Sequence, residues 1–381
     1  MSNRAHKKKD VLKGSNVLLV TLTGGANYGN RLQHFALKTA IEKQGYAVVS
    51  LNVRGNPESS AKLHIKEAAL STAKMLGIHR LRSKLARMKR RDKLSAFDRT
   101  HMGTILYIPV DQVRRTNWQA YHCAVTGSDQ VWHNWHWKNV PDELSYFYLD
   151  FMPVDKRVSY APSFGFTAFP HEDIETHRRG LMDMCALSCR EQEGCELIEQ
   201  LTGRKAQKVL DPTLLLTADE WKQLEEKPKH SVPERYMIQF FLGKVSEEYA
   251  DEMSRISLEQ KIPIINLQDS NDPENYGLSP SEFIWMIHHA DTVCTDSFHA
   301  SVFSILFERN LRVFERISPQ HGNMFGRLHD LLEPLGLMGN VYGVDKSMST
   351  ALSEPAKRYL ENERRFSNEY LRNSLAGKRT E

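Results

Sequence analysis

The sequence predicts an α/β protein with two domains, and three observations support this prediction. The chain has 381 residues, which is more than a single compact hydrophobic core usually organises. Near the N-terminus, an apolar β-branched run, a glycine-rich loop, an amphipathic helix pattern and a second apolar run follow one another. Strand and helix patterns begin to alternate again after residue 235, behind a stretch rich in Lys, Glu and Pro at 217–235. Two α/β units joined by a crossing segment are therefore expected.

The first unit opens on a loop with unusual polar content. The pattern predicts, in order, a strand at 17–22, a glycine-rich turn at 23–30, a helix at 31–44 and a strand at 47–51. The turn contains neither the G-x-G-x-x-G dinucleotide fingerprint nor the Gly-Lys-Ser/Thr of a P-loop. It carries Asn27, Tyr28 and Asn30 where a nucleotide-binding loop would present bare backbone. The loop alone is therefore a weak functional signal.

The remaining elements complete both units and divide the chain. Further strands are predicted at 121–126, 157–161, 186–191, 236–241, 262–266, 292–295 and 311–314, and helices at 246–260, 279–289 and 351–375. We expect a basic flexible tail at 1–14, an N-terminal domain at 15–216 with a basic helical insertion near 60–100, and a C-terminal domain at 217–345. The last segment, 346–381, is expected to be a helix that can pack back across the domain junction.

Polar side chains follow two of the predicted strands at their carboxyl ends. Residues 127–132 follow one strand, and Asp296, Ser297 and His299 follow another. Such positions face the crevice where α/β proteins bind ligands, and the free N–H groups of the next helix attract anions. The alternative is that Asp296 and Ser297 only cap the helix and that His299 is a hydrogen-bonded core residue. These residues alone leave both interpretations open.

The composition excludes several classes of protein. The chain is 40% hydrophobic and 26% charged, and its formal net charge of +4 is too small to indicate nucleic acid binding. No run approaches the roughly 20 apolar residues of a membrane span, and the N-terminus lacks the apolar core of a signal peptide. The 5 cysteines show no spacing typical of a zinc site. We expect a cytoplasmic protein with free cysteines, no metal and no cofactor.

A basic stretch at 74–93 permits two interpretations. Ile78, Leu81, Leu85 and Met88 recur at intervals of three and four among Lys and Arg residues, which is typical of a basic amphipathic helix. Such a helix can make a peripheral contact with the anionic inner face of a membrane. It can equally pack its apolar stripe on its own domain and leave the charges in water.

Six short motifs, found in the same order over roughly residues 15–336, resemble the polysaccharide pyruvyl transferase family. They are Gly25-Ala26-Asn27-Tyr28-Gly29-Asn30, Thr126-Gly127-Ser128-Asp129-Gln130-Val131-Trp132, Ser188-Cys189-Arg190-Glu191, Leu210-Asp211-Pro212-Thr213, Ser279-Pro280-Ser281-Glu282-Phe283 and Thr295-Asp296-Ser297-Phe298-His299. Each motif is weak alone, and their common order makes the resemblance specific. It implies a GT-B-like fold, in which two Rossmann-like domains face each other across a cleft.

The resemblance also implies a reaction. Family members transfer pyruvate from phosphoenolpyruvate to a sugar and leave a ketal on two hydroxyls. The acceptor is expected to be a cell-surface glycan or its lipid-linked or nucleotide-linked precursor. Phosphoenolpyruvate carries a carboxylate and a phosphate, both of which guanidinium groups bind through paired hydrogen bonds. Arg190 and Arg327 are the candidate donor-binding residues, together with Ser297 at a helix N-terminus.

Proton transfer needs a group that titrates near neutral pH. His299 meets this need as a general acid or base, and Asp129 is a candidate partner base or a ligand of the sugar hydroxyls. Trp132 is expected either to stack on a sugar face or to pack in the core, whereas Asp211 is expected to form a structural turn with Pro212. The remaining candidates for the acceptor or donor pocket are Asn27, Tyr28, Asn30, Ser128 and Gln130.

Two other functions are compatible with this pattern. A glycosyltransferase that uses a nucleotide sugar would have the same architecture, because fold does not fix function. It would require a nucleotide and would make no use of phosphoenolpyruvate. A non-catalytic glycan-binding protein is the third hypothesis, and it predicts that His299→Ala leaves the biological role intact. The clustering of polar groups at strand ends in both halves disfavours it.

Overall fold

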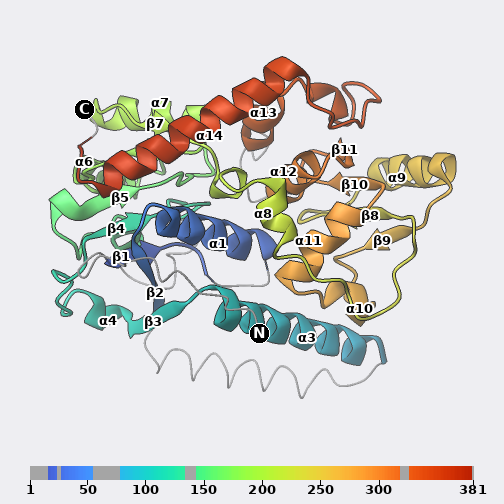
Figure 1. The fold of residues 1–381 in the computed structure, drawn as a ribbon, viewed down its shortest axis with the longest axis horizontal. Helices are drawn as coiled ribbons and strands as arrows, with labels where there is room; N and C mark the ends of the chain where they lie inside the picture. Colours follow the sequence, from blue (N-terminus) through green and yellow to red (C-terminus); the bar gives the residue numbers. More distant parts are fainter. Residues whose placement is uncertain (1–15, 24–26, 55–77, 134–142, 318–325, 380–381) are drawn as a thin grey trace, which may run out of the picture.

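The computed structural model describes residues 16–23, 27–54, 78–133, 143–317 and 326–379 (Figure 1). The predicted tail at 1–14 and the part of the predicted insertion before residue 78 lie outside these ranges. Within them, strands from the two halves of the chain form separate parallel sheets, as predicted.

The N-terminal half is built on a five-stranded sheet with the order β3-β2-β1-β4-β5. Its strands are β1 (Asn16–Val20), β2 (Ala47–Arg54), β3 (Thr104–Pro109), β4 (Cys123–Thr126) and β5 (Arg157–Ser159). An isolated bridge between Val158 and Ala186 places the short parallel pair β6 (Ser188–Cys189) and β7 (Gln207–Lys208) beside β5. The strand order reverses between β1 and β4, and in open α/β sheets such a reversal marks the ligand crevice.

The C-terminal half repeats this design on a smaller scale. Its sheet has the order β11-β10-β8-β9. The strands are β8 (Met237–Phe240), β9 (Ile264–Asn266), β10 (Thr292–Thr295) and β11 (Asn310–Val313). Here the order reverses between β8 and β10, so that the second crevice lies at the end of the strand that carries Thr295. The predicted architecture of two Rossmann-like domains, as in GT-B proteins, is confirmed.

Helices cover both sheets, and several of them begin at side chains that cap their N-termini. Their ranges are α1 (Tyr28–Lys43), α3 (Ile78–His101), α4 (Val110–Val113), α5 (Glu143–Phe147), α6 (Ile174–Met182), α7 (Gln192–Thr202), α8 (Ala218–Lys222), α9 (Glu247–Gln260), α10 (Pro273–Tyr276), α11 (Pro280–His289), α12 (Phe298–Leu306), α13 (Gly326–Leu332) and α14 (Glu354–Leu375). Thr217 with Glu220 forms a capping box at α8, and Ser279 with Glu282 forms another at α11. None of the described helices has both the length and the apolar content that crossing a membrane requires.

The first helix starts earlier than the sequence predicts. We expected a turn up to Asn30 and a helix from Arg31, but α1 begins at Tyr28. The side-chain oxygen of Asn27 accepts a hydrogen bond of 2.8 Å from the backbone N–H of Gly29, which satisfies a free donor of the first turn. Tyr28, Gly29 and Asn30 are therefore helical residues rather than loop residues.

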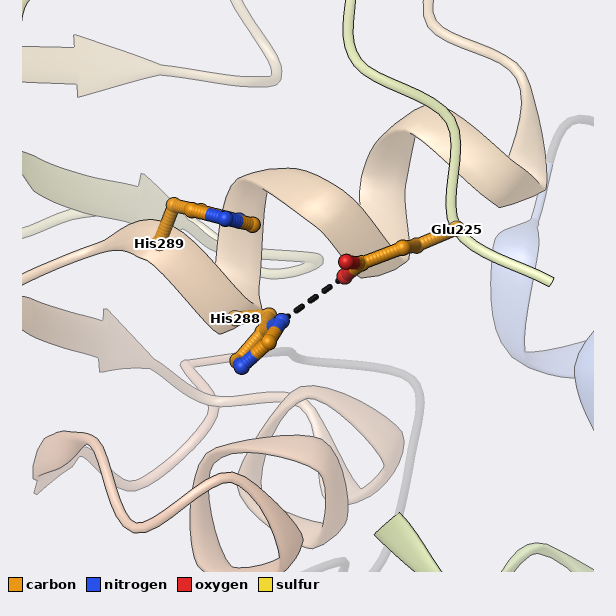
Figure 2. Close-up of side chains that lie close together, drawn as sticks. All are labelled: Glu225, His288 and His289. Atoms are coloured by element: carbon orange, nitrogen blue, oxygen red, sulfur yellow. Dashed lines mark hydrogen bonds and ion pairs between the residues drawn. The ribbon is translucent and has the colours of Figure 1, made fainter. Parts of the chain in front are cut away.

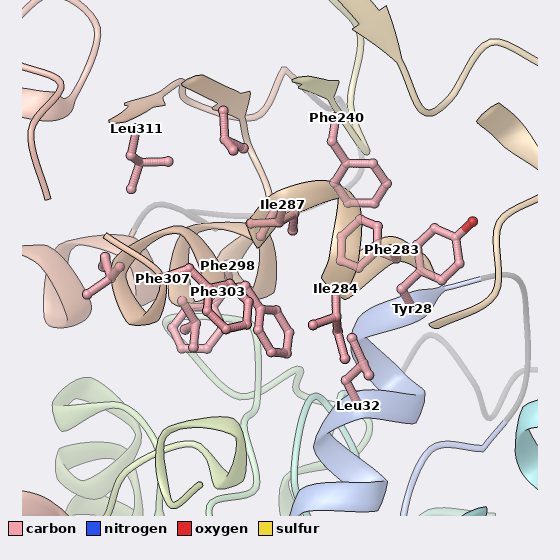
Figure 3. Packing of buried hydrophobic residues seen from close by; sticks show 14 of the residues in the cluster. Tyr28, Leu32, Phe240, Phe283, Ile284, Ile287, Phe298, Phe303, Phe307 and Leu311 are labelled. Atoms are coloured by element: carbon pink, nitrogen blue, oxygen red, sulfur yellow. The ribbon is translucent and has the colours of Figure 1, made fainter. Parts of the chain in front are cut away.

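The two halves share one large hydrophobic cluster. Tyr28 and Leu32 of α1 lie against Phe283 and Ile284 of α11 (Figure 3). The rings of Tyr28 and Phe283 stack with their centroids 4.5 Å apart. Burial of apolar surface between α1 and α11 thus fixes how the domains face each other.

The last helix returns to the N-terminal half. Figure 1 shows α14, in red, running from α13 back across the molecule to the side of β5. Ser367 Oγ accepts a hydrogen bond from the backbone N–H of Leu210 at 2.9 Å, and the Tyr370 hydroxyl donates to the carbonyl of Ser159 at 2.9 Å. Tyr370, Leu371 and Leu375 belong to the core that covers one face of the first sheet.

The five cysteines are all buried and free. This confirms the prediction of unpaired thiols. Burial raises the pKa of Cys123 to about 12 because it disfavours the thiolate, so that this thiol stays protonated at neutral pH.

Candidate active site

The polar residues at the two strand-order reversals meet where the domains touch. His299 lies in the first turn of α12, directly after β10, as predicted. Gly29 lies in the first turn of α1, which follows β1. A Cβ atom placed on Gly29 would collide with Nδ1 of His299, so only glycine permits this approach. The N-terminal turns of α1 and α12, from opposite domains, are therefore in direct contact.

Asp211 is the centre of the cluster. Its side chain is fully buried, and Oδ2 accepts hydrogen bonds from Arg190 Nη1 at 2.8 Å and from Ser128 Oγ at 3.2 Å. Oδ1 accepts from the backbone N–H and the hydroxyl of Thr213, at 2.9 and 2.6 Å. His299 Nε2 lies 3.7 Å from Oδ2. Burial raises the pKa of Asp211, but His299, Arg190 and Thr213 together hold it well below the usual range for aspartate.

Arg190 is held in one orientation by several partners. It follows β6, and its Nε donates to Glu191 Oε1 at 2.8 Å while Nη1 donates to Asp211. Its guanidinium carbon lies 4.8 Å from the ring centroid of Phe298, which is a cation–π distance. Burial lowers the pKa of Arg190, but the carboxylates of Glu191, Asp211 and Asp129 raise it by more. The residue is therefore a fixed cation.

Asp129 stands between two guanidinium groups. Its Oδ1 is 3.6 Å from Arg190 Nη2 and 3.8 Å from Arg327 Nη1, and both distances exceed a hydrogen bond. The backbone of Asp129 has a φ of 65°, a left-handed conformation that asparagine and aspartate adopt more readily than other residues with side chains. Burial, followed by repulsion from Arg190, lowers the pKa of Arg327 to about 10. Two buried cations thus lie close enough to repel each other.

His299 is enclosed rather than exposed. One edge of its ring packs on Gly29, and the other points to Asp211. Nε2 is inaccessible to solvent and has no hydrogen-bond partner among the described residues. A buried nitrogen without a partner is costly, by roughly 1–3 kcal/mol, and such atoms call for a ligand or a functional explanation.

Two pockets border the cluster and share Glu191, Arg327 and Asp330 in their walls. One is lined by residues of both domains, including Arg190, Asp211 and Phe298. The other includes Ser163, Phe166 and Gly326 in its lining. A concave surface therefore adjoins both arginines.

The structure brings Asp129, Arg190, Arg327 and His299 together, with Ser128 joined to them through Asp211. The hydroxyl of Ser297 caps α12, at 3.5 Å from the N–H of Ala300. Asp296 is not a cap. Its carboxylate accepts hydrogen bonds from the backbone N–H groups of Leu242 and Gly243, both at 2.7 Å, and so fixes the loop after β8.

Several pocket candidates have other surroundings. Tyr28 and Trp132 are fully buried in hydrophobic cores, where Trp132 stacks on Tyr148 at 5.0 Å and the Tyr28 hydroxyl donates to the Leu278 carbonyl at 3.1 Å. The burial of Tyr28 corrects the expectation that this ring lines the pocket, whereas the burial of Trp132 agrees with core packing, one of its two expected roles. Asn27 caps α1, and Asn30 accepts a hydrogen bond from Gln33 Nε2 through its carbonyl at 2.8 Å. Gln130 packs against Gly165, and Gly165 lines the second pocket.

Sequence reasoning missed Asp211 and Glu191 as members of the cluster. Asp211 was expected to be only a turn residue, and it does cap the short helix at Pro212–Leu214. Its second oxygen, however, binds Arg190 and Ser128. A signal was present, because Asp211 and Arg190 belong to neighbouring motifs of the same resemblance, and a buried arginine requires carboxylates. Glu191 stands in the same motif as Arg190.

Comparison with known proteins gives a family. The sequence profile of the family described as polysaccharide pyruvyl transferase matches residues 27–317. No curated protein matches the chain significantly. Among solved structures, the S. aureus MnaA–UDP complex shows a TM-score of 0.45 and 10% identity, covering 96% of this chain and 91% of that chain.

Two further solved structures cover nearly the whole chain. Anabaena HepE in complex with UDP and glucose has a TM-score of 0.44 and 9% identity, with 95% of this chain and 99% of that chain covered. The UDP-GlcNAc 2-epimerase from Neisseria meningitidis bound to UDP-GlcNAc has a TM-score of 0.41 and 10% identity, with 95% and 97% covered.

Proposed function

Because the chain belongs to the polysaccharide pyruvyl transferase family, we propose that it moves pyruvate from phosphoenolpyruvate onto two hydroxyls of a sugar. The product is a ketal on a cell-surface glycan or on its lipid-linked or nucleotide-linked precursor. The observation that carries this proposal is the cluster of Arg190, Arg327, His299, Asp129 and Asp211 beside pockets that border both domains.

The cluster suits a donor with two anionic groups. Arg190 and Arg327 are both buried, and Asp129 lies near each of them without making a hydrogen bond to either. A carboxylate or phosphate of the donor would bind the two guanidiniums at hydrogen-bond distance and displace Asp129 from between them. The N-terminal turns of α1 and α12 add partial positive charge at the same place. Asp129 then becomes free to bind a sugar hydroxyl.

The reaction moves protons as well as pyruvate. A proton must reach the methylene carbon of phosphoenolpyruvate, two sugar hydroxyls must bond to the neighbouring carbon, and the phosphate must leave. One hydroxyl proton then balances the new methyl group, and the other leaves on the phosphate. His299 Nε2 is the atom that we assign to this transfer, since it is buried and has no other partner in the described structure.

Asp211 is assigned a positioning role. It binds Arg190 at 2.8 Å and lies 3.7 Å from His299, so a single carboxylate couples the donor-binding cation to the proton-transferring ring. Because the carboxylate faces the Nε2 edge of the ring, its negative charge would stabilise the imidazolium after proton uptake.

The first test is the thermal stability of the protein in the presence of phosphoenolpyruvate. A ligand that binds only the folded state stabilises it by about 2.7 kcal/mol at 100 times its Kd. We expect a clear rise in Tm for the wild type, and a much smaller rise in Arg190→Lys and Arg327→Lys. These variants keep the charge but lose the paired donors. Arg235→Lys, in an exposed pair with Asp291, is the matched control and should respond like the wild type.

Two outcomes would count against the proposal. A rise in Tm with a nucleotide sugar and none with phosphoenolpyruvate would indicate a glycosyltransferase. An equal response in the wild type and in both arginine variants would mean that the donor binds elsewhere.

We further propose that α3 contacts an anionic membrane surface, which would bring the enzyme to a lipid-linked acceptor. One face of α3 is docked on the C-terminal half, where Lys93 pairs with Glu282 at 2.5 Å and Lys89 with Glu274 at 2.7 Å. On the rest of the helix, Leu85 and Met88 are 51% and 42% exposed. Exposed cations surround them at Arg82, Lys84, Arg87 and Arg91. Exposed apolar side chains among cations are typical of helices that lie on membranes.

A further inference from the structure

We infer that Glu225, His288 and His289 form a binding site for a divalent transition metal ion, with the chemistry that suits Zn²⁺. The ligand atoms of the three side chains all lie within 4.8 Å of one another. Figure 2 shows the carboxylate of Glu225 next to His288, with the ring of His289 on the same side of the helix end. None of these residues belongs to the cluster around Asp211, so the inference does not depend on the proposed transferase activity.

His289 is already oriented as a ligand. Its Nδ1 lies 3.0 Å from the carbonyl oxygen of Trp285, so that the ring proton sits on Nδ1 and the lone pair is on Nε2. The ring also stacks on the Trp285 indole, with centroids 4.1 Å apart and planes at 18°. Histidines that bind metals commonly donate their second N–H to a backbone carbonyl in this way, because the bond fixes both the tautomer and the ring.

Glu225 and His288 supply the other two ligands. Oε2 of Glu225 lies 2.8 Å from Nδ1 of His288, and both side chains are largely buried, with 19% and 23% exposed. An ion would replace this hydrogen bond with two coordinate bonds. His288 would then carry its proton on Nε2, leaving the Nδ1 lone pair for the metal. The packing of His288 on Phe307, with ring centroids 4.7 Å apart, limits how far its ring can turn.

The donor set determines the class of ion. Two imidazoles and one carboxylate suit zinc, copper or nickel, whereas calcium and magnesium prefer oxygen ligands alone. Bonds of 2.0–2.1 Å to a tetrahedral Zn²⁺ place ligand atoms roughly 3.4 Å apart. No pair of ligand atoms is more than 4.8 Å apart, so the widest separation must shrink by at most about 1.4 Å. Water would fill the fourth position.

Such an ion would tie the crossing segment to the C-terminal domain. Glu225 lies between α8 and β8, and the two histidines end α11. The segment is already joined to the other end of α11, where the N–H of Glu226 donates to the Ser281 carbonyl at 3.2 Å. Lys227 lies 5.7 Å from the ring centroid of Trp285, so one cation stands near the site and will weaken metal binding as ionic strength falls. We assign the site a structural role, that of a clamp at the entry to the C-terminal domain.

The experiment is a calorimetric titration of metal-free full-length protein with ZnCl₂. We expect one site with a Kd in the micromolar range. Glu225→Gln and His289→Ala should each weaken binding at least tenfold. His329→Ala is the matched control, because this exposed histidine also lies beside a carboxylate, Glu333 at 3.6 Å, but belongs to no group of three close ligand atoms among the described residues. It should bind Zn²⁺ within twofold of the wild type.

Replacement of Zn²⁺ by Co²⁺ gives a second readout, because tetrahedral nitrogen and oxygen ligands produce a strong visible absorption. The band should appear with the wild type and His329→Ala and be absent in His289→Ala. The inference is wrong if Glu225→Gln and His289→Ala bind Zn²⁺ as tightly as the wild type. Zinc affinity and the response to phosphoenolpyruvate are separate measurements, so failure of one leaves the other standing.

Discussion

Gly29 is the residue at which the two domains approach most closely near the proposed catalytic histidine. A methyl group here would collide with Nδ1 of His299. We expect Gly29→Ala to destabilise the protein by about 1–3 kcal/mol through overpacking and to displace the His299 ring. Urea unfolding measures the first effect. Histidine ring NMR signals, assigned with His299→Gln, measure the second.

The control for this change is Gly339→Ala. A Cβ atom at Gly339 would meet its nearest heavy atom at 3.4 Å, an ordinary contact. This variant should leave both the stability and the His299 signal unchanged. A normal His299 signal in Gly29→Ala would show that the ring does not depend on the glycine.

The buried carboxylate of Asp211 is expected to stabilise the folded protein through its charge. We expect Asp211→Asn to lower the free energy of unfolding at pH 7 by about 3 kcal/mol, because Arg190 loses a buried partner. The pKa of Asp211 is lowered in the folded state, so its contribution is complete above the unfolded pKa of about 3.9 and is lost as the pH falls below that value.

Urea unfolding from pH 8 to pH 3 tests this expectation. The difference between wild type and Asp211→Asn should be constant down to about pH 5 and shrink below about pH 4. Asp219→Asn removes an 87% exposed carboxylate from a surface pair and should change stability by less than about 0.5 kcal/mol. A difference that grows in acid would contradict the assigned charge state.

For single residues, the sequence indicates which residues belong to the candidate site better than it indicates which contacts they make. Asp129, Arg190, Arg327 and His299 could be chosen because each residue type fits an anion or a proton transfer. The role of Asp211 could not be predicted in this way, because its hydrogen bonds to Arg190 and Ser128 join residues that are 21 and 83 positions apart in the sequence. Nor could a sequence show that Tyr28 and Trp132 face inward, since an aromatic ring suits a core as well as a sugar.

Among the elements, α3 is the one whose surroundings the sequence left most open. The helix packs on α10 and α11 through Lys89, Arg90 and Lys93, and it leaves another face in water. The spacing of apolar residues predicted an amphipathic helix, but it could not show which partner the polar face would meet. The predicted start of α1 was wrong. The glycine-rich run suggested a turn up to Asn30, but Asn27 caps the helix and α1 begins at Tyr28.

The exposed face of α3 makes a prediction of its own. Replacing Arg82, Arg87 and Arg91 with Glu should weaken binding to vesicles that contain phosphatidylserine by at least tenfold, since each cation near such a surface contributes about 1 kcal/mol. Cosedimentation with these vesicles and with neutral phosphatidylcholine vesicles measures the effect.

An equal change of charge elsewhere is the control. Lys357, Arg358 and Arg365 are exposed on α14, and their replacement with Glu should leave vesicle binding unchanged. The membrane proposal fails if both triple variants lose binding equally, or if the wild type does not prefer the anionic vesicles.

For the whole molecule, the pH dependence of stability follows from two buried histidines. His34 bonds to Ser50 Oγ at 2.7 Å and His177 to the Tyr148 hydroxyl at 2.8 Å, and burial lowers the pKa of each to about 3. The folded state favours the neutral form of each ring. The stability that each histidine contributes is therefore fully present above about pH 6.5, and it is lost as the pH falls toward 3.

Each of these histidines should therefore lower the free energy of unfolding by about 2 kcal/mol when the pH falls from 7 to 5. His34→Gln and His177→Gln should each reduce that loss by the same amount, whereas His329→Gln, on the surface, should not. Urea unfolding at the two pH values gives the comparison. A wild type that is equally stable at pH 7 and pH 5 would contradict the assignment.

The two-domain architecture could be predicted because periodicity, length and turn residues all point to the same answer. How the two domains contact each other could not be predicted, because the contact between α1 and α11 depends on packed surfaces and not on a local sequence pattern. The return of α14 was expected only as a possibility, and the structure supplies its contacts with Leu210 and Ser159.

That return has a consequence for biosynthesis. Tyr370, Leu371 and Leu375 complete a core whose other members include Val17 and Leu19 of the first strand. Domains generally fold in order as the ribosome releases them, but here the N-terminal domain must wait for Tyr370, Leu371 and Leu375, which are synthesised after the strands of the C-terminal domain. The C-terminal domain can form its own sheet first, and the domain that is synthesised first is finished last. A ribosome that stalls before residue 370 therefore leaves a nascent chain whose first half exposes an incomplete core to chaperones and proteases.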